Sequence, residues 1–230
     1  MSRRMRRAVL LMGVAAALVV GFCFYQYRMT NTRQALVARS VELAAEGSYA
    51  DAARTIDKAL KAPQDGKFSD YALLLRKAGF LQKSGDTEQA MSIAMRVIKD
   101  TGEGQQEFDD GWARIVSICS EEEEYDKLAS ILEGSGIESV KSKYYNYLVY
   151  DPVFRDPPGT YEGELNLIIE SQGVGTVFYT IDGEEPTDRS NLYTDGIRLR
   201  PGIYTVKVLF INRYGLKSSI ITGSYQILDD

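Results

Sequence analysis

The carboxylates are the side chains in this sequence whose types and spacing could do chemistry. Four glutamates follow one another at Glu121–Glu124, and Asp126 comes close behind them. Neighbouring carboxylates can share acid–base work or bind calcium. Calcium loops, however, place their oxygen ligands at alternate positions around a glycine turn, and consecutive side chains at a helix end point in different directions. We therefore interpret the run as a solvated turn, with no metal site and no catalytic pair.

Histidine is absent from the chain, and cysteine occurs twice, at Cys23 and Cys119. Without histidine, Ser-His-Asp and Cys-His catalysis are excluded, and zinc sites lose their commonest ligand. Cys23 lies inside an apolar run far from Cys119, so the placement of the two excludes an internal disulfide framework. We expect a protein that is not an enzyme and that needs no cofactor.

An apolar segment of 18 residues without a charge runs over residues 8–25, behind four arginines within the first seven residues. As a helix it would be about 27 Å long, close to the hydrocarbon thickness of a bilayer. We predict a transmembrane helix here, in a single-pass protein of the bacterial cell membrane. The positive charges before the helix predict a cytoplasmic N-terminus and place residues 26–230 outside the cytoplasm. A cleaved secretory signal is the alternative, and a lipoprotein signal is disfavoured because Phe22 precedes Cys23.

The chain beyond the apolar segment is acidic. It holds all 32 Asp and Glu and 23 of the 27 Lys and Arg, which gives a net charge of 23 − 32 = −9. An acidic surface repels phosphate backbones. We therefore expect no nucleic-acid partner.

Apolar residues recur at helical spacing from Thr32 to Tyr150, which predicts an all-helical segment. A period of 38 residues relates three short stretches in it, which begin at Gly47, Gly85 and Glu123. Each copy is predicted to be a helix, a tight turn and a second helix. One small or apolar residue of each second helix is expected to pack close to its partner helix: Ala52, Ala90 and Leu128.

This pattern resembles tetratricopeptide repeats, and the match weakens along the chain. The matching residues are Leu36, Gly47, Tyr49, Ala52, Ile56, Ala59 and Pro63 in the first copy, Leu74, Ala78, Gly85, Ala90, Ala94 and Val97 in the second, and Trp112, Tyr125 and Leu132 in the third. The resemblance implies an α-solenoid of about three helix pairs that binds a protein partner along its concave face.

The groove residues that this resemblance implies are Gln34, Val37, Val41, Leu75, Gln82, Lys83, Asp110, Ser117 and Ser120. The alternative is that they are ordinary exposed positions on a short spacer. Lys83 alone does not make a basic clamp, so capture of a carboxylate is not indicated.

Helical spacing gives way to alternation after residue 150, and the turn-rich stretch Asp156–Gly159 marks a domain junction. Alternating residues predict a hairpin formed by 165–169 and 176–181, and further strands at 204–210 and 221–227. Short strands with regular turns indicate a small antiparallel β-sandwich of the immunoglobulin type.

The most specific motif of the chain lies in this strand segment. Its residues are Tyr179, Thr180, Asp182, Gly183, Pro186, Thr187 and Tyr193, followed late by Gly215 and Ser218. With them, about residues 152–228 resemble the chitobiase/β-hexosaminidase C-terminal domain, a family without catalytic residues. We interpret the motif as structural, because an Asp-Gly pair makes a tight turn at a strand end.

Tyrosines offer an alternative, carbohydrate-binding function for the sandwich. An exposed platform could be formed by Tyr161, Tyr204, Tyr214 and Tyr225, unless they pack in the core. Four further tyrosines at the boundary are expected to hold the two outer domains together: Tyr144, Tyr145, Tyr147 and Tyr150.

The sequence thus predicts a membrane-anchored scaffold outside the cytoplasm that binds a protein partner through its repeats. The alternative is a cell-surface module that binds cell-wall glycan through the β-sandwich. The predicted domains are a cytoplasmic N-terminus at 1–7, a transmembrane helix at 8–25, a linker at 26–31, helical repeats at 32–150 and a β-sandwich at 151–230.

Overall fold

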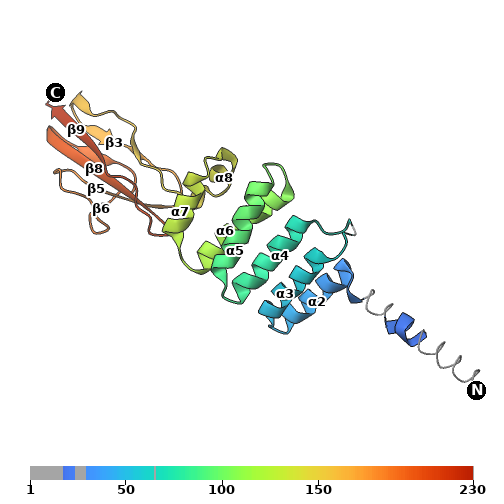
Figure 1. Cartoon of the computed structure of the whole chain (residues 1–230). Helices are drawn as coiled ribbons and strands as arrows, with labels where there is room; N and C mark the ends of the chain where they lie inside the picture. The colour runs from blue at the N-terminus through green and yellow to red at the C-terminus, as the bar shows by residue number, and fades with distance from the viewer. Residues whose placement is uncertain (1–17, 24–29, 65, 230) are drawn as a thin grey trace, which may run out of the picture. The chain divides into compact units, whose positions relative to one another are not determined.

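The computed structural model describes residues 18–23, 30–64 and 66–229. The chain forms two compact units, Met1–Ile118 and Cys119–Asp230. The first is helical, and the second begins with helices and continues as strands (Figure 1). The predicted order, helices followed by a β-sheet domain, is confirmed. Helix changes to strand near the predicted junction at residue 151, whereas the compact units divide earlier in the chain.

The structure corrects the prediction of a transmembrane helix. Among the described residues, none of the helices combines the length and the apolar character that a membrane span needs. Of the predicted span 8–25, the structure describes only 18–23, a helical stretch of about 9 Å. The remaining residues of the span, and the cytoplasmic segment 1–7, lie outside the described residues. A position of residues 26–230 outside the cytoplasm stays a prediction.

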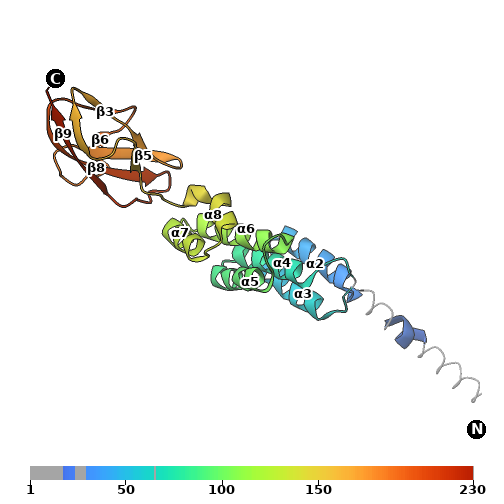
Figure 2. The ribbon, with the colours of Figure 1, turned by 90° about the horizontal axis from the view of Figure 1, so that it is seen from above.

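The helices of the first unit stack in chain order. They are α2 (Arg33–Ala45), α3 (Tyr49–Lys61), α4 (Asp70–Lys83), α5 (Thr87–Asp100) and α6 (Gln106–Glu121), the last of which runs three residues into the second unit. Consecutive helices from α2 to α5 pack against each other, and Figures 1 and 2 show them side by side from two directions. Their interfaces are built on small residues: Ala52, Ala59, Ala78, Ala90 and Ala94 are all fully buried.

The period of 38 residues is visible in the backbone of the turns. Gly47 and Gly85 have φ angles of +80° and +87°, and Glu123 has +56° at the equivalent place between α6 and α7 (Tyr125–Gly134). Each turn also repeats one hydrogen bond, in which the N–H of the next residue donates to a carbonyl five positions back, at 2.8–2.9 Å. The third copy therefore keeps the turn although it lacks the glycine.

The second unit starts with α7, α8 (Glu138–Lys143) and a short 3-10 helix, η1 (Tyr145–Tyr147). Its strands are β1 (Val153–Phe154), β2 (Gly159–Glu162), β3 (Leu165–Leu167), β4 (Ile169–Glu170), β5 (Gly175–Thr180), β6 (Asn191–Leu192), β7 (Ile197–Leu199), β8 (Gly202–Asn212) and β9 (Ile221–Leu228). Five of them form one sheet in the order β2-β9-β8-β5-β6, and two pairs, β1-β4 and β3-β7, are separate. The β-sandwich is thereby confirmed.

One hydrophobic core lies inside the sandwich. Alternate residues of β8 supply Val206, Val208 and Phe210, and the short strands opposite supply Leu167 and Ile169. These positions follow the period of two that the sequence shows. The predicted strand at 204–210 is confirmed as part of β8.

Two predictions about strand pairing are wrong. Residues 165–169 do not form a hairpin with 176–181, because β3 pairs with β7, β4 pairs with β1, and β5 pairs with β6 and β8. The sandwich is also not antiparallel throughout, since β2 runs parallel to β9. Alternation identifies the face that a strand buries but not the strand that it pairs with, and here residues 171–174 lead the chain from one sheet to another.

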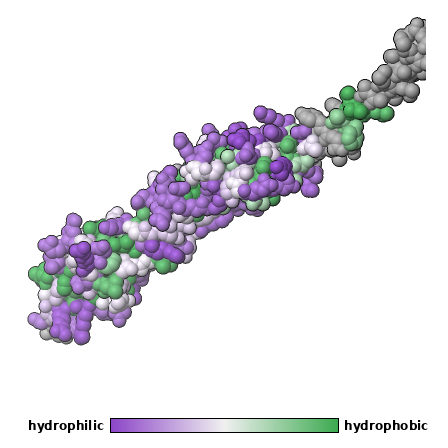
Figure 3. Space-filling view, turned by 90° about the horizontal axis from the view of Figure 1, so that it is seen from below, coloured by the Kyte–Doolittle hydropathy of each residue, from purple (hydrophilic) through white to green (hydrophobic). Residues whose placement is uncertain are grey.

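Hydrophilic residues cover most of the helical surface on the face that Figure 3 shows, and hydrophobic residues appear as small separate patches. Single exposed apolar residues of this kind are ordinary on a protein surface.

Candidate functional site

A groove lies on the first unit between α4 and α6. It has a volume of about 720 Å³ and is lined by Tyr49, Ala72, Leu75, Arg76, Gly79, Phe80, Lys83, Asp110, Ala113 and Arg114. The six α4 residues lie in two rows of spacing four, at positions 72, 76 and 80 and at positions 75, 79 and 83, so they form one face of that helix. The same holds for the three residues of α6. Each helix thus presents a single stripe to the groove.

The rim of the groove is mainly basic. Arg76 and Lys83 of α4 and Arg114 of α6 face one acid, Asp110. The groove therefore carries a net charge of 3 − 1 = +2, whereas the whole chain carries −5. Phe80, which is partly exposed, supplies apolar surface between these charges, and the buried Leu75 lies at the floor. A hollow of this composition attracts carboxylates and can bury apolar side chains next to them.

Arg114 is held in place by polar contacts to α4. Its Nη1 donates to Oε1 of Gln82 at 2.9 Å, and Nε2 of Gln82 donates to Oγ of Ser117 at 3.0 Å. Gln82 is only 5% exposed, so this chain of hydrogen bonds lies under the groove. It fixes the guanidinium in one orientation, which lowers the entropy that binding would cost.

Gly79 makes room for the same guanidinium. A Cβ atom built at this position would lie 2.9 Å from Nη2 and 3.2 Å from Cζ of Arg114. Any larger residue at this point of α4 would push the arginine aside. Glycine in a helix lowers the free energy of unfolding by roughly 0.5–1 kcal/mol relative to alanine. The space that it leaves for Arg114 gives its use here a packing reason.

The structure brings part of the predicted groove together. Leu75, Lys83 and Asp110 line the groove, while Gln82 and Ser117 lie beneath it and position Arg114. The others lie elsewhere. Gln34 is exposed on α2, Val37 is in the core, Val41 is 48% exposed on α2, and Ser120 is half-buried in the second unit.

Sequence reasoning missed the two arginines of the groove, and with them its basic character. Arg76 stands seven residues before Lys83, which places both on one face of a helix. Arg114 stands four residues after Asp110, which does the same on α6. The sequence shows the spacing within each helix, but it does not show that α4 packs against α6.

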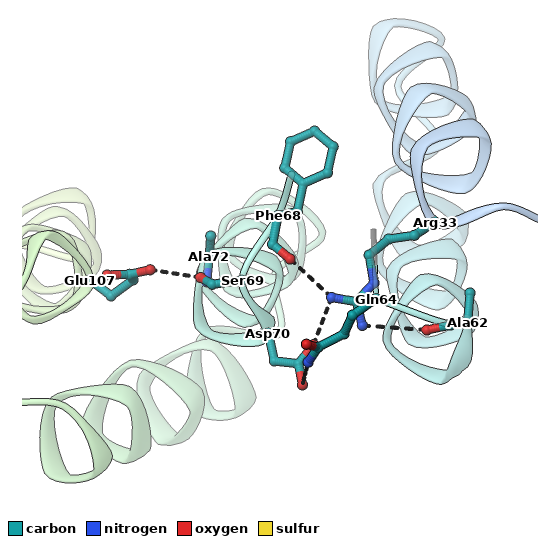
Figure 4. Close-up of polar contacts among 8 residues, drawn as sticks. All are labelled: Arg33, Ala62, Gln64, Phe68, Ser69, Asp70, Ala72 and Glu107. Carbon is teal, nitrogen blue, oxygen red and sulfur yellow. Dashed lines mark hydrogen bonds and ion pairs between the residues drawn. The ribbon is translucent and has the colours of Figure 1, made fainter. Parts of the chain in front are cut away.

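A buried arginine fixes the connection between α3 and α4, away from the groove. Nη1 of Arg33 lies 2.7 Å from Oδ1 of Asp70 and donates to O of Phe68 at 3.0 Å, and Nη2 donates to O of Ala62 at 3.5 Å (Figure 4). Arg33 is 2% exposed. Because the guanidinium satisfies backbone carbonyls as well as a carboxylate, its role is structural.

The first turn of α4 is also tied to α6. The Ser69 hydroxyl accepts the N–H of Ala72 at 3.0 Å and donates to Oε1 of Glu107 at 2.6 Å (Figure 4). The hydroxyl favours the charged carboxylate, so it lowers the pKa of Glu107 below its ordinary value. Ser69 thus caps α4 and links it to the helix on the other side of the groove.

The acidic run Glu121–Glu124 is exposed at the turn between α6 and α7. Within the ranges that the structure describes, no group of three or more Cys, Asp or Glu side chains is arranged to hold a metal ion. Burial raises the pKa of the Cys119 thiol, which is the opposite of what an activated nucleophile needs.

The four tyrosines considered for carbohydrate binding do not form an exposed platform. Tyr225 is buried and donates its hydroxyl to O of Asp156 at 2.8 Å, and burial raises its pKa. Tyr161 and Tyr204 pack against the core, and Tyr161 donates to O of Pro157 at 2.6 Å. The fourth, Tyr214, belongs to a different cluster.

Tyr214 stacks with two tyrosines from the helices of the second unit. Its ring centroid lies 4.4 Å from that of Tyr125 in α7 and 4.9 Å from that of Tyr147 in η1. Burial is the main cause of the raised pKa of Tyr214, and a hydrogen bond with Tyr147 raises it further. Of the boundary tyrosines, Tyr147 thus binds the helices to the sandwich within this unit, whereas Tyr145 and Tyr150 are exposed.

The signature residues of the strand segment make local structure. Oγ1 of Thr180 donates to O of Glu184 at 2.6 Å, and the N–H of Glu184 donates to Oδ1 of Asp182 at 3.1 Å. Gly183 between them has a φ of +89°. Further along, the Tyr193 hydroxyl accepts the N–H of Ile169 at 3.0 Å and so joins two parts of the sandwich.

A comparison with protein families finds a match in this segment. Residues 156–222 match the model of the chitobiase/β-hexosaminidase C-terminal domain. No curated protein and no solved structure matches the chain. The match associates the β-sandwich with a domain named after carbohydrate-cleaving enzymes, but likeness of fold does not transfer an activity.

Proposed function

We propose that the helical unit is a tetratricopeptide-like interaction module that holds an acidic segment of a partner protein in the groove between α4 and α6. The carrying observation is the convergence of Arg76, Lys83 and Arg114 around the apolar surface of Leu75 and Phe80. The module is a scaffold and not an enzyme.

Charge and shape together support this class of partner. Hydrogen bonds between guanidinium groups and carboxylates are stronger than neutral ones, and a planar guanidinium can bind both carboxylate oxygens at once. Arg114 is already oriented by Gln82, so it can bind a carboxylate with little further ordering. A leucine or similar side chain next to the carboxylate would cover Leu75 and Phe80.

The repeat character of the unit also supports the proposal. Turns of the same backbone geometry recur at Gly47, Gly85 and Glu123, and alanines close the helix interfaces. Stacked helix pairs of this kind create elongated surfaces that suit extended peptides. That the repeats are of the tetratricopeptide type is itself part of this proposal, because the third copy matches the pattern weakly.

Site-specific crosslinking tests this function. A photo-reactive amino acid replaces Ala113, which is exposed at the groove, and in a control variant it replaces Glu88, which is exposed on α5 outside the groove. We expect crosslinks at position 113 to a segment with several Asp or Glu residues, identified by mass spectrometry, and none of these at position 88. Crosslinked segments without acidic residues, or the same segments at both positions, would contradict the proposal.

A carbohydrate-binding role of the β-sandwich is the second candidate function. The family match of residues 156–222 favours it. The tyrosines Tyr161, Tyr204 and Tyr225 do not, because they are engaged in the packing of the sandwich. A carbohydrate site must therefore lie on other residues of the second unit.

A further inference from the structure

Two parts of the family signature, far apart in the sequence, meet at one pocket of the second unit. The pocket has a volume of about 520 Å³ and lies over β5 and the end of β8. Asp188, from the loop after the Pro186-Thr187 motif, contributes to its lining. So do Arg213 and Lys217, from the connection that contains Gly215.

Hydrogen bonds within the loop fix the position of Asp188. The N–H of Thr187 donates to Oγ of Ser190 at 2.9 Å, and the N–H of Arg189 donates to Oγ1 of Thr187 at 3.2 Å. These contacts enclose residue 188 in a closed turn. The signature residue Thr187, together with Ser190, therefore holds a carboxylate at the pocket.

The cationic side of the pocket is equally ordered. Oδ1 of Asn212 accepts the N–H groups of Tyr214 and Leu216 at 2.9 and 3.0 Å, and Gly215 adopts a φ of +82°. The N–H of Arg213 donates to O of Val174 at 2.9 Å. This turn holds Arg213 and, beyond it, Lys217 at the same pocket as Asp188.

The lining between the two sides is apolar and includes one aromatic ring. Phe178, Val174 and Ile211 contribute to it. Phe178 alternates with Val177, which points into the core, so its ring stands on the outer face of the sheet. It is partly exposed, and the sandwich core does not use it.

We propose that this pocket binds a sugar ring that carries a carboxylate, as part of an acidic glycan. The inference rests on the carbohydrate-binding function of the sandwich. The C–H face of a pyranose would pack on Phe178, hydroxyl groups would donate to Asp188, and the carboxylate would bind Arg213 and Lys217. Two cations against one acid favour an acidic sugar over a neutral one.

Titration of the full chain with two matched tetrasaccharides tests the site. One alternates glucuronate and N-acetylglucosamine, and the other contains N-acetylglucosamine alone. Binding is followed by NMR through the backbone amides of Thr176 and Gly215. We expect the acidic tetrasaccharide to bind at least about tenfold more tightly than the neutral one, as an added charge-assisted contact should give.

Variants localise the binding. Arg213→Ala/Lys217→Ala should weaken binding of the acidic tetrasaccharide by about tenfold or more, and Phe178→Leu should weaken binding of both sugars. The control Arg155→Ala/Arg200→Ala removes the same charge from exposed residues outside the lining and should change neither affinity. Thermal unfolding checks that each variant is folded.

Each contrary result has a distinct meaning. If neither tetrasaccharide binds at millimolar concentration, both this site and the carbohydrate-binding function are wrong. If binding persists unchanged in the Arg213→Ala/Lys217→Ala and Phe178→Leu variants, the sandwich binds carbohydrate elsewhere and the proposed pocket is wrong. Equal affinity for the two sugars would overturn the assignment of a carboxylated ligand.

Discussion

Nη1 of Arg33 lies 2.7 Å from Oδ1 of Asp70, across the connection between α3 and α4. The arginine is buried, whereas the carboxylate side chain is about half exposed. The pair therefore joins the start of α2 to the start of α4 and leaves water access to one partner only. Since Arg33 also meets two backbone carbonyls, its contacts form a single structural unit (Figure 4).

Arg33→Met should destabilise the first unit. The variant leaves Asp70 and the carbonyls of Phe68 and Ala62 without the guanidinium, which should lower the free energy of unfolding by about 2–4 kcal/mol. Denaturant unfolding measures the effect. Arg39→Ala removes an exposed arginine paired with Glu42 and should cost less than about 0.5 kcal/mol. Equal losses in the two variants would refute the structural role of Arg33.

Gly79→Ala should separate groove function from stability. The new methyl group displaces the guanidinium of Arg114 from its hydrogen bond to the buried Gln82, and this loss offsets the better helix propensity of alanine. The free energy of unfolding should therefore change by less than about 1 kcal/mol. Binding of an acidic peptide should weaken, because the guanidinium is displaced. Unchanged peptide affinity would show that the placement of Arg114 does not matter.

Gly111→Ala is the matched variant on α6. Its Cβ would lie 2.7 Å from Cγ1 of Ile98 and 3.5 Å from O of Ala94, in a packed interface. The free energy of unfolding should fall by about 1–3 kcal/mol despite the better helix propensity of alanine. Thermal or denaturant unfolding compares the stability of this variant with that of Gly79→Ala. Equal stability of the two variants would contradict the close packing of Gly111 against Ile98.

Glu123→Gly should stabilise the turn between α6 and α7. Glu123 has a φ of +56°, a conformation that costs about 1–2 kcal/mol for a residue with a Cβ. Because glycine loses more entropy on folding, we expect a net gain of about 0.5–1 kcal/mol. Glu122→Gly removes the same charge from a neighbour without a positive φ and should destabilise. A loss of stability in Glu123→Gly as large as in Glu122→Gly would refute this account.

The contact between Ser69 and Glu107 should make stability depend on pH. The folded-state pKa of Glu107 is lowered, so the contact stabilises the fold above the ordinary pKa of glutamate, about 4.3, and this contribution is lost as the pH falls through the lowered value. The difference in stability between wild type and Glu107→Gln should thus shrink towards pH 3. In Ser69→Ala, NMR titration should show a higher pKa for Glu107, and an unchanged pKa would exclude the hydroxyl as its cause.

Local features of this fold follow from the sequence because they depend on neighbours along the chain. Helical spacing and the 38-residue period predict the turns at Gly47 and Gly85, and alternation predicts the strands that form β8 and β9. Pairing of β3 with β7 and the parallel pair of β2 and β9 were not predictable in this way. Strand partners depend on how the whole core closes.

The candidate groove shows the same limit. Lys83 and Asp110 were predicted, but Arg76 and Arg114 were not, because the groove depends on which faces of α4 and α6 meet. The position of Arg114 depends further on Gln82 and on the missing side chain of Gly79. Such contacts between residues more than 30 positions apart carry no local sequence signal.

The most direct test of the central claim is a calorimetric titration of the full chain with a short peptide rich in aspartate and leucine. We predict binding that weakens with added salt and drops by about tenfold or more in Arg76→Ala/Lys83→Ala. Lys58→Ala/Lys99→Ala, which removes the same charge from exposed positions outside the groove, should leave the affinity unchanged. No binding, or equal weakening by both double variants, would contradict the assignment of the groove between α4 and α6 as a site for acidic partner segments.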